Sequence, residues 1–268
     1  MAVNKILIIA PSWLGDAIMS HSLIQTLSIL YPEHDIDVAA PASTREIYRL
    51  MPQVKTVISL PFGHRELQLI NRWRFARQLA LRSYARSYVL PNSLKSALIP
   101  FFAGIALRIG WLGEQRVLLL NSWKKLEKKS SLPMVDRYYQ LAFFSQPHAQ
   151  PDKAPYPVFP QDRNASLLVR NLFGLTEKPI LLVAPGAMFG KSKMWPKEYY
   201  AQVCLHFLKK DWQVLLLGTA SELEDCKAIA GIIATSGTFQ NLHNLAGKTS
   251  AIGFHYPRAV TSILWLEE

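Results

Sequence analysis

Short apolar runs alternate with longer amphipathic stretches along the chain. The first run, Ile6–Ala10, stops at Pro11, and a helical pattern starts after Gly15 and Asp16. An uninterrupted apolar run of this length predicts a strand buried on both faces of a parallel sheet, followed by a tight loop and a helix. The same patterning predicts further strands at 36–40, 54–60, 87–90 and 108–111, with helices at 16–31, 45–51, 66–84 and 94–103. This alternation favours an α/β fold whose parallel strands are joined by right-handed crossovers.

The pattern starts again in the second half of the chain. Five prolines between residues 147 and 160 break any regular element, so we place a domain boundary after residue 155. Ile180–Pro185 then repeats the form of Ile6–Pro11, a strand ending in Ala-Pro. Later elements are predicted at 195–210 (helix), 213–217 (strand), 221–233 (helix) and 244–247 (the end of a short strand). The sequence thus predicts two doubly wound domains, 1–155 and 156–268. The second is incomplete, with barely three strands before the irregular residues 251–268.

The composition is that of a globular protein with an anionic partner. Half of the residues are hydrophobic, 18% are charged, and the formal net charge is +11. Such basicity suits nucleic acid, an acidic membrane surface or a phosphorylated substrate, but no zinc-ligand pair or aromatic RNP signature supports nucleic acid. Cys204 and Cys226 are expected to be buried, reduced thiols. Because we find no signal peptide and no spanning apolar run, we expect a cytoplasmic protein whose basic surface permits contact with the inner face of a membrane.

The loop after the first predicted strand holds a carboxylate where ligands of such sheets bind, beyond the carboxyl end of the strand. Gly15 allows either the close approach of a ligand or a strained turn. Asp16 has two interpretations. It caps the following helix, or it is a general base that takes a proton from a substrate hydroxyl.

Two loops of the second domain suggest a nucleotide site. Residues 185–196 combine Gly186 and Gly190 with a serine and two lysines, so this segment either wraps N–H groups and ammonium charge around a diphosphate or is a flexible surface loop. Its glycine spacing fits neither a Walker A loop nor the G-x-G-x-x-G pattern, which disfavours a dinucleotide oxidoreductase. In residues 218–224, a carboxylate can accept the ribose hydroxyls of a nucleotide, whereas the alternative is a capping box formed by Ser221 and Glu224.

Basic residues gather in the first domain. Lys95 lies on the first turn of the helix predicted at 94–103, facing the expected site. Several arginines either form a solvated face or meet lipid phosphate, namely Arg72, Arg74, Arg77, Arg82 and Arg86. The pair Lys124-Lys125 is expected in a solvated loop. The histidines show no metal-ligand spacing, and no metal is expected.

Taken together, these loops form a specific match to one known family, and this match runs in order from residue 5 to about residue 250. Its segments are Pro11–Asp16 with Met19-Ser20, Pro91–Leu98, Phe102–Ile105, Arg108–Trp111, Pro185–Ala187, Phe189-Gly190, Lys193, Trp195-Pro196 and Asn244–Gly247. They resemble glycosyltransferase family 9, the lipopolysaccharide heptosyltransferases, and within it the heptosyltransferase II branch.

The resemblance implies a GT-B architecture, in which a Rossmann-like acceptor domain (1–155) is followed by an ADP-sugar-binding domain (156–268). It implies inverting transfer of L-glycero-D-manno-heptose from ADP-heptose to the first heptose of the lipopolysaccharide inner core, with no cofactor. By the same likeness, Asp16 is the general base. The implied donor-side residues are Gly186, Ala187, Gly190, Lys193 and Glu222. The implied acceptor-side residues are Ser12, Trp13, Gly15, Asn92 and Lys95.

The last part of the sequence departs from the family pattern. The family continues into an Asp-Ser/Thr-Gly-x-x-His loop of the nucleotide site, and no such motif follows Thr249-Ser250. Residues 251–268 have the character of a shifted reading frame or a truncated gene, so we expect an incomplete donor site and impaired transfer. The alternative is a non-catalytic remnant that binds lipopolysaccharide core or nucleotide only.

Overall fold

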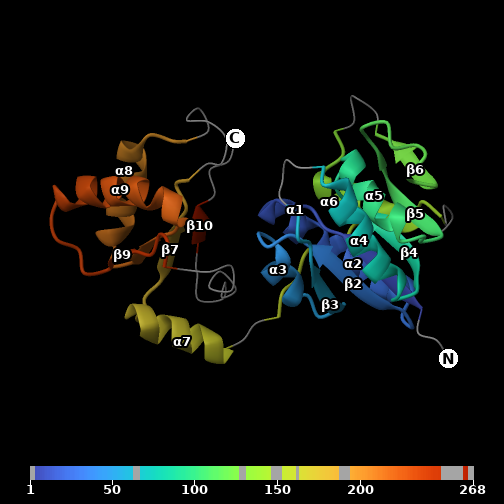
Figure 1. Ribbon diagram of the computed structural model, residues 1–268. Coiled ribbons are helices and arrows are strands. Elements are labelled where there is room, and N and C mark those ends of the chain that lie inside the picture. Colours follow the sequence, from blue (N-terminus) through green and yellow to red (C-terminus); the bar gives the residue numbers. More distant parts are fainter. Residues whose placement is uncertain are drawn as a thin grey trace. The chain divides into compact units, whose positions relative to one another are not determined.

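The chain forms two compact units, Met1–Pro160 and Gln161–Glu268 (Figure 1). The computed structural model describes residues 4–62, 67–126, 131–145, 153–160, 163–186, 194–248 and 262–264. The division between the units falls five residues after the predicted position, at the end of the proline-rich stretch.

A six-stranded parallel sheet forms the centre of the first unit. Its strands are β1 (Lys5–Ile9), β2 (Asp35–Ala40), β3 (Val54–Ser59), β4 (Tyr84–Val89), β5 (Leu107–Leu112) and β6 (Ser122–Lys125). Their order is β3-β2-β1-β4-β5-β6, and Ile8 of β1 pairs with Val38 on one side and Tyr88 on the other. This is the Rossmann strand order, in which the direction of winding reverses between β1 and β4. The loops after these two strands are therefore where a ligand is expected.

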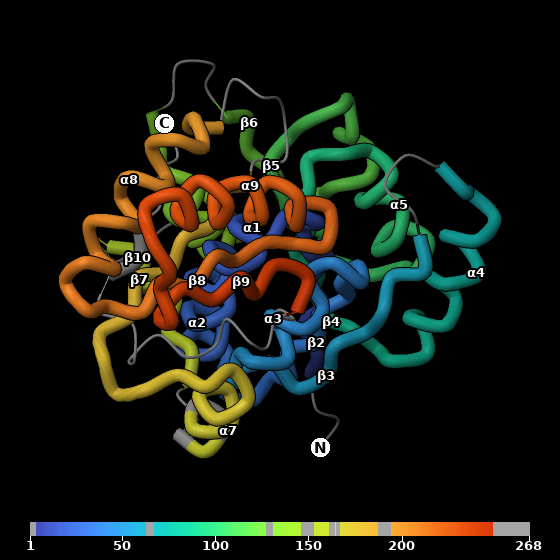
Figure 2. The backbone as a smooth tube through the Cα atoms, turned by 90° about the vertical axis from the view of Figure 1, so that its left-hand side faces the viewer, coloured from blue at the N-terminus to red at the C-terminus, as the bar shows by residue number. Residues whose placement is uncertain are grey.

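Helices connect these strands on both faces of the sheet. They are α1 (Leu14–Met19), α2 (His21–Leu30), α3 (Arg45–Arg49), α4 (Leu69–Ala80), α5 (Leu94–Phe102) and α6 (Met134–Gln140), followed by the 3-10 turn η1 (Leu141–Phe143). Helices α4 and α5 lie side by side (Figures 1 and 2). Helix α2 packs instead against α6.

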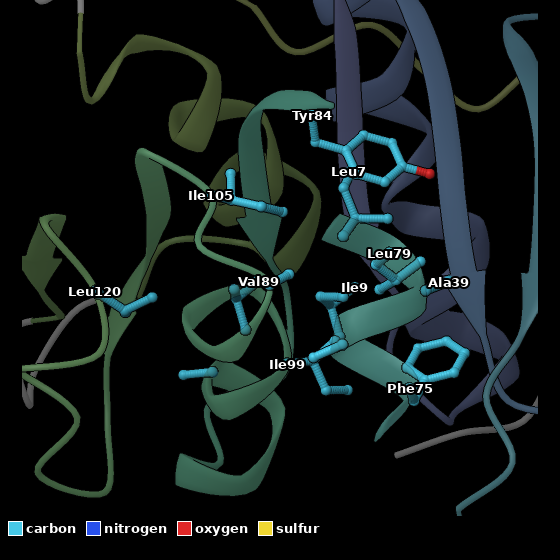
Figure 3. Packing of buried hydrophobic residues seen from close by; sticks show 13 residues of the cluster. Leu7, Ile9, Ala39, Phe75, Leu79, Tyr84, Val89, Ile99, Ile105 and Leu120 are labelled. Carbon is cyan, nitrogen blue, oxygen red and sulfur yellow. The ribbon is translucent and has the colours of Figure 1, made fainter. Parts of the chain in front are cut away.

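The apolar runs of the sequence become buried strands. Leu7 and Ile9 point toward α4 and α5 and pack with Phe75, Leu79 and Ile99 (Figure 3). The alternate β1 residues, Ile6 and Ile8, are equally buried because helices cover both faces of the sheet. Burying each such side chain contributes about 1.5–3 kcal/mol, which explains the unbroken apolar run.

The second unit has a four-stranded parallel sheet of order β10-β7-β8-β9. Its strands are β7 (Ile180–Val183), β8 (Gln213–Leu216), β9 (Leu242–Asn244) and β10 (Ser262–Leu264), and its helices are α7 (Arg163–Phe173), α8 (Lys197–Leu208), the 3-10 turn η3 (Ala220–Glu222) and α9 (Leu223–Ala234). Cys204 and Cys226 lie buried and free in the core between sheet and helices, as expected. Burial raises the pKa of the Cys204 thiol to about 12, so this thiol stays neutral at physiological pH.

The α/β, Rossmann-like fold class is confirmed, but four local expectations were wrong. The helix predicted at 16–31 is two helices that meet at Ser20. Lys124-Lys125 lies in the exposed edge strand β6 and not in a loop, because its backbone pairs with β5. Helices α6 and α7 had not been predicted. Finally, residues 262–264 form a fourth strand, which pairs with β7, where the sequence predicted an irregular segment.

Candidate functional site

A pocket of about 430 Å³ opens at the carboxyl ends of β1 and β4 in the first unit. This is the position that the reversal of strand order predicts for a ligand. Of the residues singled out from the sequence, the pocket is lined by Ser12, Trp13, Asp16, Asn92 and Lys95. Gly15 lies in the first turn of α1 outside this lining, and no described atom lies within 4 Å of the position that a Cβ would take there.

Asp16 is the third residue of α1 and lies at the edge of the pocket. The N-cap position belongs to Trp13, and no side-chain hydrogen bond caps the helix, so capping does not account for the carboxylate. Burial raises the pKa of Asp16 above its ordinary value, while a hydrogen bond from the Tyr138 hydroxyl opposes that rise. Burial, followed by the Asp16 charge, raises the pKa of Tyr138, so this hydroxyl remains a protonated donor. A partly desolvated carboxylate beside a pocket has the properties of a general base.

Side chains from the loop after β2 hold the loop that carries Asp16. The Thr44 hydroxyl, which is fully buried, donates a hydrogen bond of 3.0 Å to the Pro11 carbonyl. Ser43 donates another, also of 3.0 Å, to the Ser12 carbonyl. These bonds satisfy carbonyls that have left the sheet ladder, and they fix the approach of the chain to α1.

Arg116 supports the loop after β4 that lines the pocket, and sequence reasoning missed it. Its side chain is completely buried, and its guanidinium donates to the carbonyls of Pro91 (2.5 Å) and Ser93 (3.2 Å) in the loop after β4. It also donates to the Asn92 side-chain oxygen (3.2 Å) and to the Trp111 carbonyl (2.6 Å). Burial lowers the pKa of Arg116 to about 10, so the group stays charged at neutral pH. No local pattern distinguishes this arginine from the exposed ones, since three of its four acceptors come from the loop after β4, more than twenty residues away in sequence.

Among the described residues of the pocket lining, cations outnumber carboxylates. Arg72, Lys95 and Arg137 line it together with Asp16 and Glu114. Arg72 is not the solvated residue that the sequence suggested. It is buried, its Nε donates to the Leu67 carbonyl (2.7 Å), and its guanidinium lies over the Phe62 ring. The surplus of positive charge favours an anionic ligand.

In the second unit, Gly186 and Glu222 lie in direct contact. A Cβ at Gly186 would overlap the Glu222 carboxyl group, so only glycine leaves this carboxylate its place at the end of β7. The other carboxylate oxygen accepts hydrogen bonds from the Thr219 amide (2.5 Å) and hydroxyl (2.8 Å). Ala187, Gly190 and Lys193 lie outside the described residues.

The capping box predicted from Ser221 and Glu224 was wrong. Thr219 and Glu222 form it instead, because the helical segment begins two residues earlier than Ser221 as cap would require, with η3. Glu222 thus has a structural role alongside any contact with a ligand. Its conformation is held from both sides by the loops that follow β7 and β8.

The described ranges contain neither a metal-binding cluster nor a membrane-spanning helix. There, no three His, Cys, Asp or Glu side chains are grouped so that they could bind a metal ion. Likewise, no described helix combines the length and the hydropathy needed to cross a membrane.

Comparison with known proteins supports the family resemblance that the sequence motifs indicated. A family profile described as Glycosyltransferase family 9 (heptosyltransferase) matches residues 72–254. The chain is 41% identical over 252 residues to Lipopolysaccharide heptosyltransferase 2 of Escherichia coli K12. The aligned region covers 91% of this chain and 72% of that protein. It is 42% identical over 225 residues to Lipooligosaccharide heptosyltransferase 2 of Haemophilus influenzae, covering 81% and 64% respectively.

A solved structure extends the likeness to three dimensions. The structure of Escherichia coli ADP-heptose lipopolysaccharide heptosyltransferase II superimposes with a TM-score of 0.85 at 36% identity, over 97% of this chain and 78% of that one. The profile covers more than half of the chain, and the sequence identity extends over most of it. The protein therefore belongs to glycosyltransferase family 9, the heptosyltransferases.

Proposed function

We propose that this protein transfers L-glycero-D-manno-heptose from ADP-heptose to the first heptose of the lipopolysaccharide inner core, with inversion at the anomeric carbon. The observation that carries the proposal is Asp16, a carboxylate of raised pKa at the edge of a basic pocket. The names of the similar enzymes supply the substrates, because they are lipopolysaccharide and ADP-heptose heptosyltransferases. We place the reaction in the cytoplasm, at the inner face of the membrane, and we expect no nucleic-acid partner.

In the proposed step, Asp16 takes the proton of an acceptor hydroxyl as that oxygen attacks the anomeric carbon of the donor. The new C–O bond forms on the face opposite the diphosphate, the bond to the diphosphate oxygen breaks, and ADP leaves with the electron pair. The proton then passes from Asp16 to water, which restores the base. No metal or redox partner is needed to balance the step.

The acceptor side of the proposal rests on the pocket lining. Lys95 and Arg137 face an acceptor whose inner core carries anionic groups, and Ser12, Trp13 and Asn92 contribute polar and aromatic contacts. Gly15 remains an expected acceptor contact through its backbone. The Tyr138 hydroxyl keeps one Asp16 lone pair occupied, so the remaining lone pairs are available to the substrate hydroxyl.

The donor side of the proposal rests on the loops after β7 and β8. In this proposal Glu222 accepts the ribose hydroxyls, and the support for it is that Gly186 leaves room for the carboxylate at the end of β7. The family resemblance assigns Lys193 and the backbone of residues 186–190, including Ala187 and Gly190, to the diphosphate. Backbone N–H groups and an ammonium group stabilise the negative charge that develops on the leaving ADP.

Incubation of the purified protein with ADP-heptose and an acceptor that carries the first heptose tests the function. We expect ADP release matched by a singly heptosylated product, whose new linkage has the configuration opposite to that of the donor. Acceptor binding without product would contradict the proposal in favour of a binding protein. Turnover comparable to that of the similar enzymes would contradict the impairment expected from the sequence after residue 250.

The Tyr138→Phe variant should shift the pH dependence of transfer. A base works only when deprotonated, so activity falls as the pH drops through the raised pKa of Asp16. The Tyr138 hydrogen bond lowers that pKa, and its removal should therefore move the acid limb to higher pH. The measurement is kcat against pH for both proteins.

Tyr84→Phe is the matched control for this variant. It removes a buried hydroxyl-to-carboxylate bond of 2.7 Å, to Asp37, outside the pocket lining. Its acid limb should coincide with that of the unaltered protein. An acid limb in Tyr138→Phe that stays in place or moves to lower pH would argue against Asp16 as the titrating base.

The Gly186→Ala variant should weaken nucleotide binding through Glu222. The new methyl group would displace the carboxylate from its bonds with Thr219. A displaced carboxylate would no longer accept the ribose hydroxyls. Loss of a hydrogen bond between ligand and a charged group costs about 1.5–3 kcal/mol, so we expect the Kd for ADP to rise about 10- to 100-fold by calorimetry.

A double variant separates this effect from general damage. Gly186→Ala should add little to the loss in Glu222→Ala, because the clashing side chain is already absent. Gly231→Ala, in α9 with open space around it, serves as the control and should bind ADP normally. Additive losses in the double variant would show that Gly186 acts independently of Glu222.

A further inference from the structure

Helix α4 carries apolar residues on both of its faces. Phe75, Ala76 and Leu79 are buried against the sheet. On the outer face, Leu69, Ile70 and Trp73 are 47%, 67% and 50% exposed. A helix that packs into its own unit through one face needs no apolar residues on its solvent-exposed side, and adjacent exposed ones mark an interaction surface. Figure 2 shows α4 at the outer edge of the first unit, beside α5.

Two arginines share this outer face. Arg74 and Arg77 are exposed, and within the described part of the chain neither takes part in an ion pair. The surrounding sequence reinforces their charge, since residues 67–113 contain no aspartate or glutamate. The same stretch contains seven basic residues, namely Arg72, Arg74, Arg77, Arg82, Arg86, Lys95 and Arg108. The partner of this face therefore offers negative charge together with an apolar layer.

We propose that the outer face of α4, formed by Leu69, Ile70, Trp73, Arg74 and Arg77, docks on an anionic lipid bilayer. Tryptophan and aliphatic side chains enter the boundary between headgroups and acyl chains, while arginine pairs with lipid phosphate. A second copy of the chain is a poorer occupant. A two-fold contact through this face would bring the arginines of one copy against those of the other.

Docking by α4 would also place the pocket near the lipid surface. Arg72 belongs to the same helix, and its buried guanidinium lines the pocket from the inner side. An acceptor anchored in the bilayer would then reach Asp16 without leaving the membrane surface. This consequence rests on the proposed function, whereas the docking itself does not.

Sedimentation with vesicles tests the proposal. The unaltered protein should bind vesicles that contain phosphatidylglycerol far more tightly than pure phosphatidylcholine vesicles, and salt should weaken the binding. Each surface arginine contributes roughly fivefold to such binding, so Arg74→Glu/Arg77→Glu should reduce it by at least about 25-fold. Ile70→Ser/Trp73→Ser should weaken it at unchanged net charge.

Lys209→Glu/Lys210→Glu is the matched control, because it makes the same change of charge on exposed residues of the second unit. It should keep most of the vesicle binding. Equal losses in both charge-reversal variants, or no preference for anionic vesicles, would overturn the proposal. A dimer in solution that Ile70→Ser/Trp73→Ser dissociates would overturn it too, by assigning the face to a second copy. Vesicle binding is measured without donor or acceptor, so failure of heptose transfer leaves this result intact.

Discussion

Replacing Asp16 by asparagine is expected to lower the kcat of heptose transfer by about 10²- to 10⁴-fold, the usual contribution of a general base. Asparagine keeps the size of the side chain and can still accept the Tyr138 hydrogen bond, but it cannot take a proton. The Kd values for donor and acceptor should change little. The measurement is the initial rate of product formation at saturating concentrations of both substrates.

Stability distinguishes this catalytic role from a structural one. Because burial raises the pKa of Asp16, the ionised form is less favourable in the folded protein than in the unfolded chain at neutral pH. The asparagine variant should therefore be at least as stable as the unaltered protein, while its activity is lost. Asp35→Asn, the same change at the start of β2 and outside the pocket lining, should keep full activity. An Asp16→Asn protein that transfers heptose at the normal rate would exclude Asp16 as the base.

Replacing Arg116 by leucine is expected to lower the free energy of unfolding by about 3 kcal/mol or more. A buried acceptor that loses its partner costs about 1–3 kcal/mol. Arg116 donates to the buried Trp111 carbonyl and, in part-buried bonds, to the carbonyls of Pro91 and Ser93 and the Asn92 side chain. For a unit of this size, such a loss corresponds to a fall in Tm of roughly 6–12 °C. Thermal unfolding followed by circular dichroism gives the value.

Arg116 should also affect the acceptor, because the loop that it holds lines the pocket. At a temperature where Arg116→Leu is folded, we expect weaker acceptor binding with donor binding unchanged. Arg116→Lys should retain more stability than Arg116→Leu but less than the unaltered protein. An ammonium group lacks the planar, forked donors with which the guanidinium reaches four acceptors. Arg74→Leu, at an exposed arginine, should shift stability by about 0.5 kcal/mol at most. An Arg116→Leu protein as stable as this control would show that the buried bonds contribute nothing net.

Local patterns decided most of the architecture. Unbroken apolar runs mark strands such as β1 and β7, because strands buried on both faces tolerate few polar residues. The position of Asp16 and Lys95 also followed from sequence, since each lies in a loop or first turn directly after a predicted strand. The short strand β10 escaped prediction because three residues give too little periodicity to detect.

By itself, the sequence determined the alternating strands and helices, the parallel sheets and the loops that carry the candidate residues, because all of these depend on neighbours within a few positions. Only the tertiary structure decided the state of those residues. It brought the Tyr138 hydroxyl into a hydrogen bond with Asp16, buried Arg116 where its guanidinium donates to the Asn92 side chain, and placed the Glu222 carboxylate in contact with Gly186. These contacts join segments that are far apart in the chain, so their burial and hydrogen bonds depend on packing that no local pattern encodes.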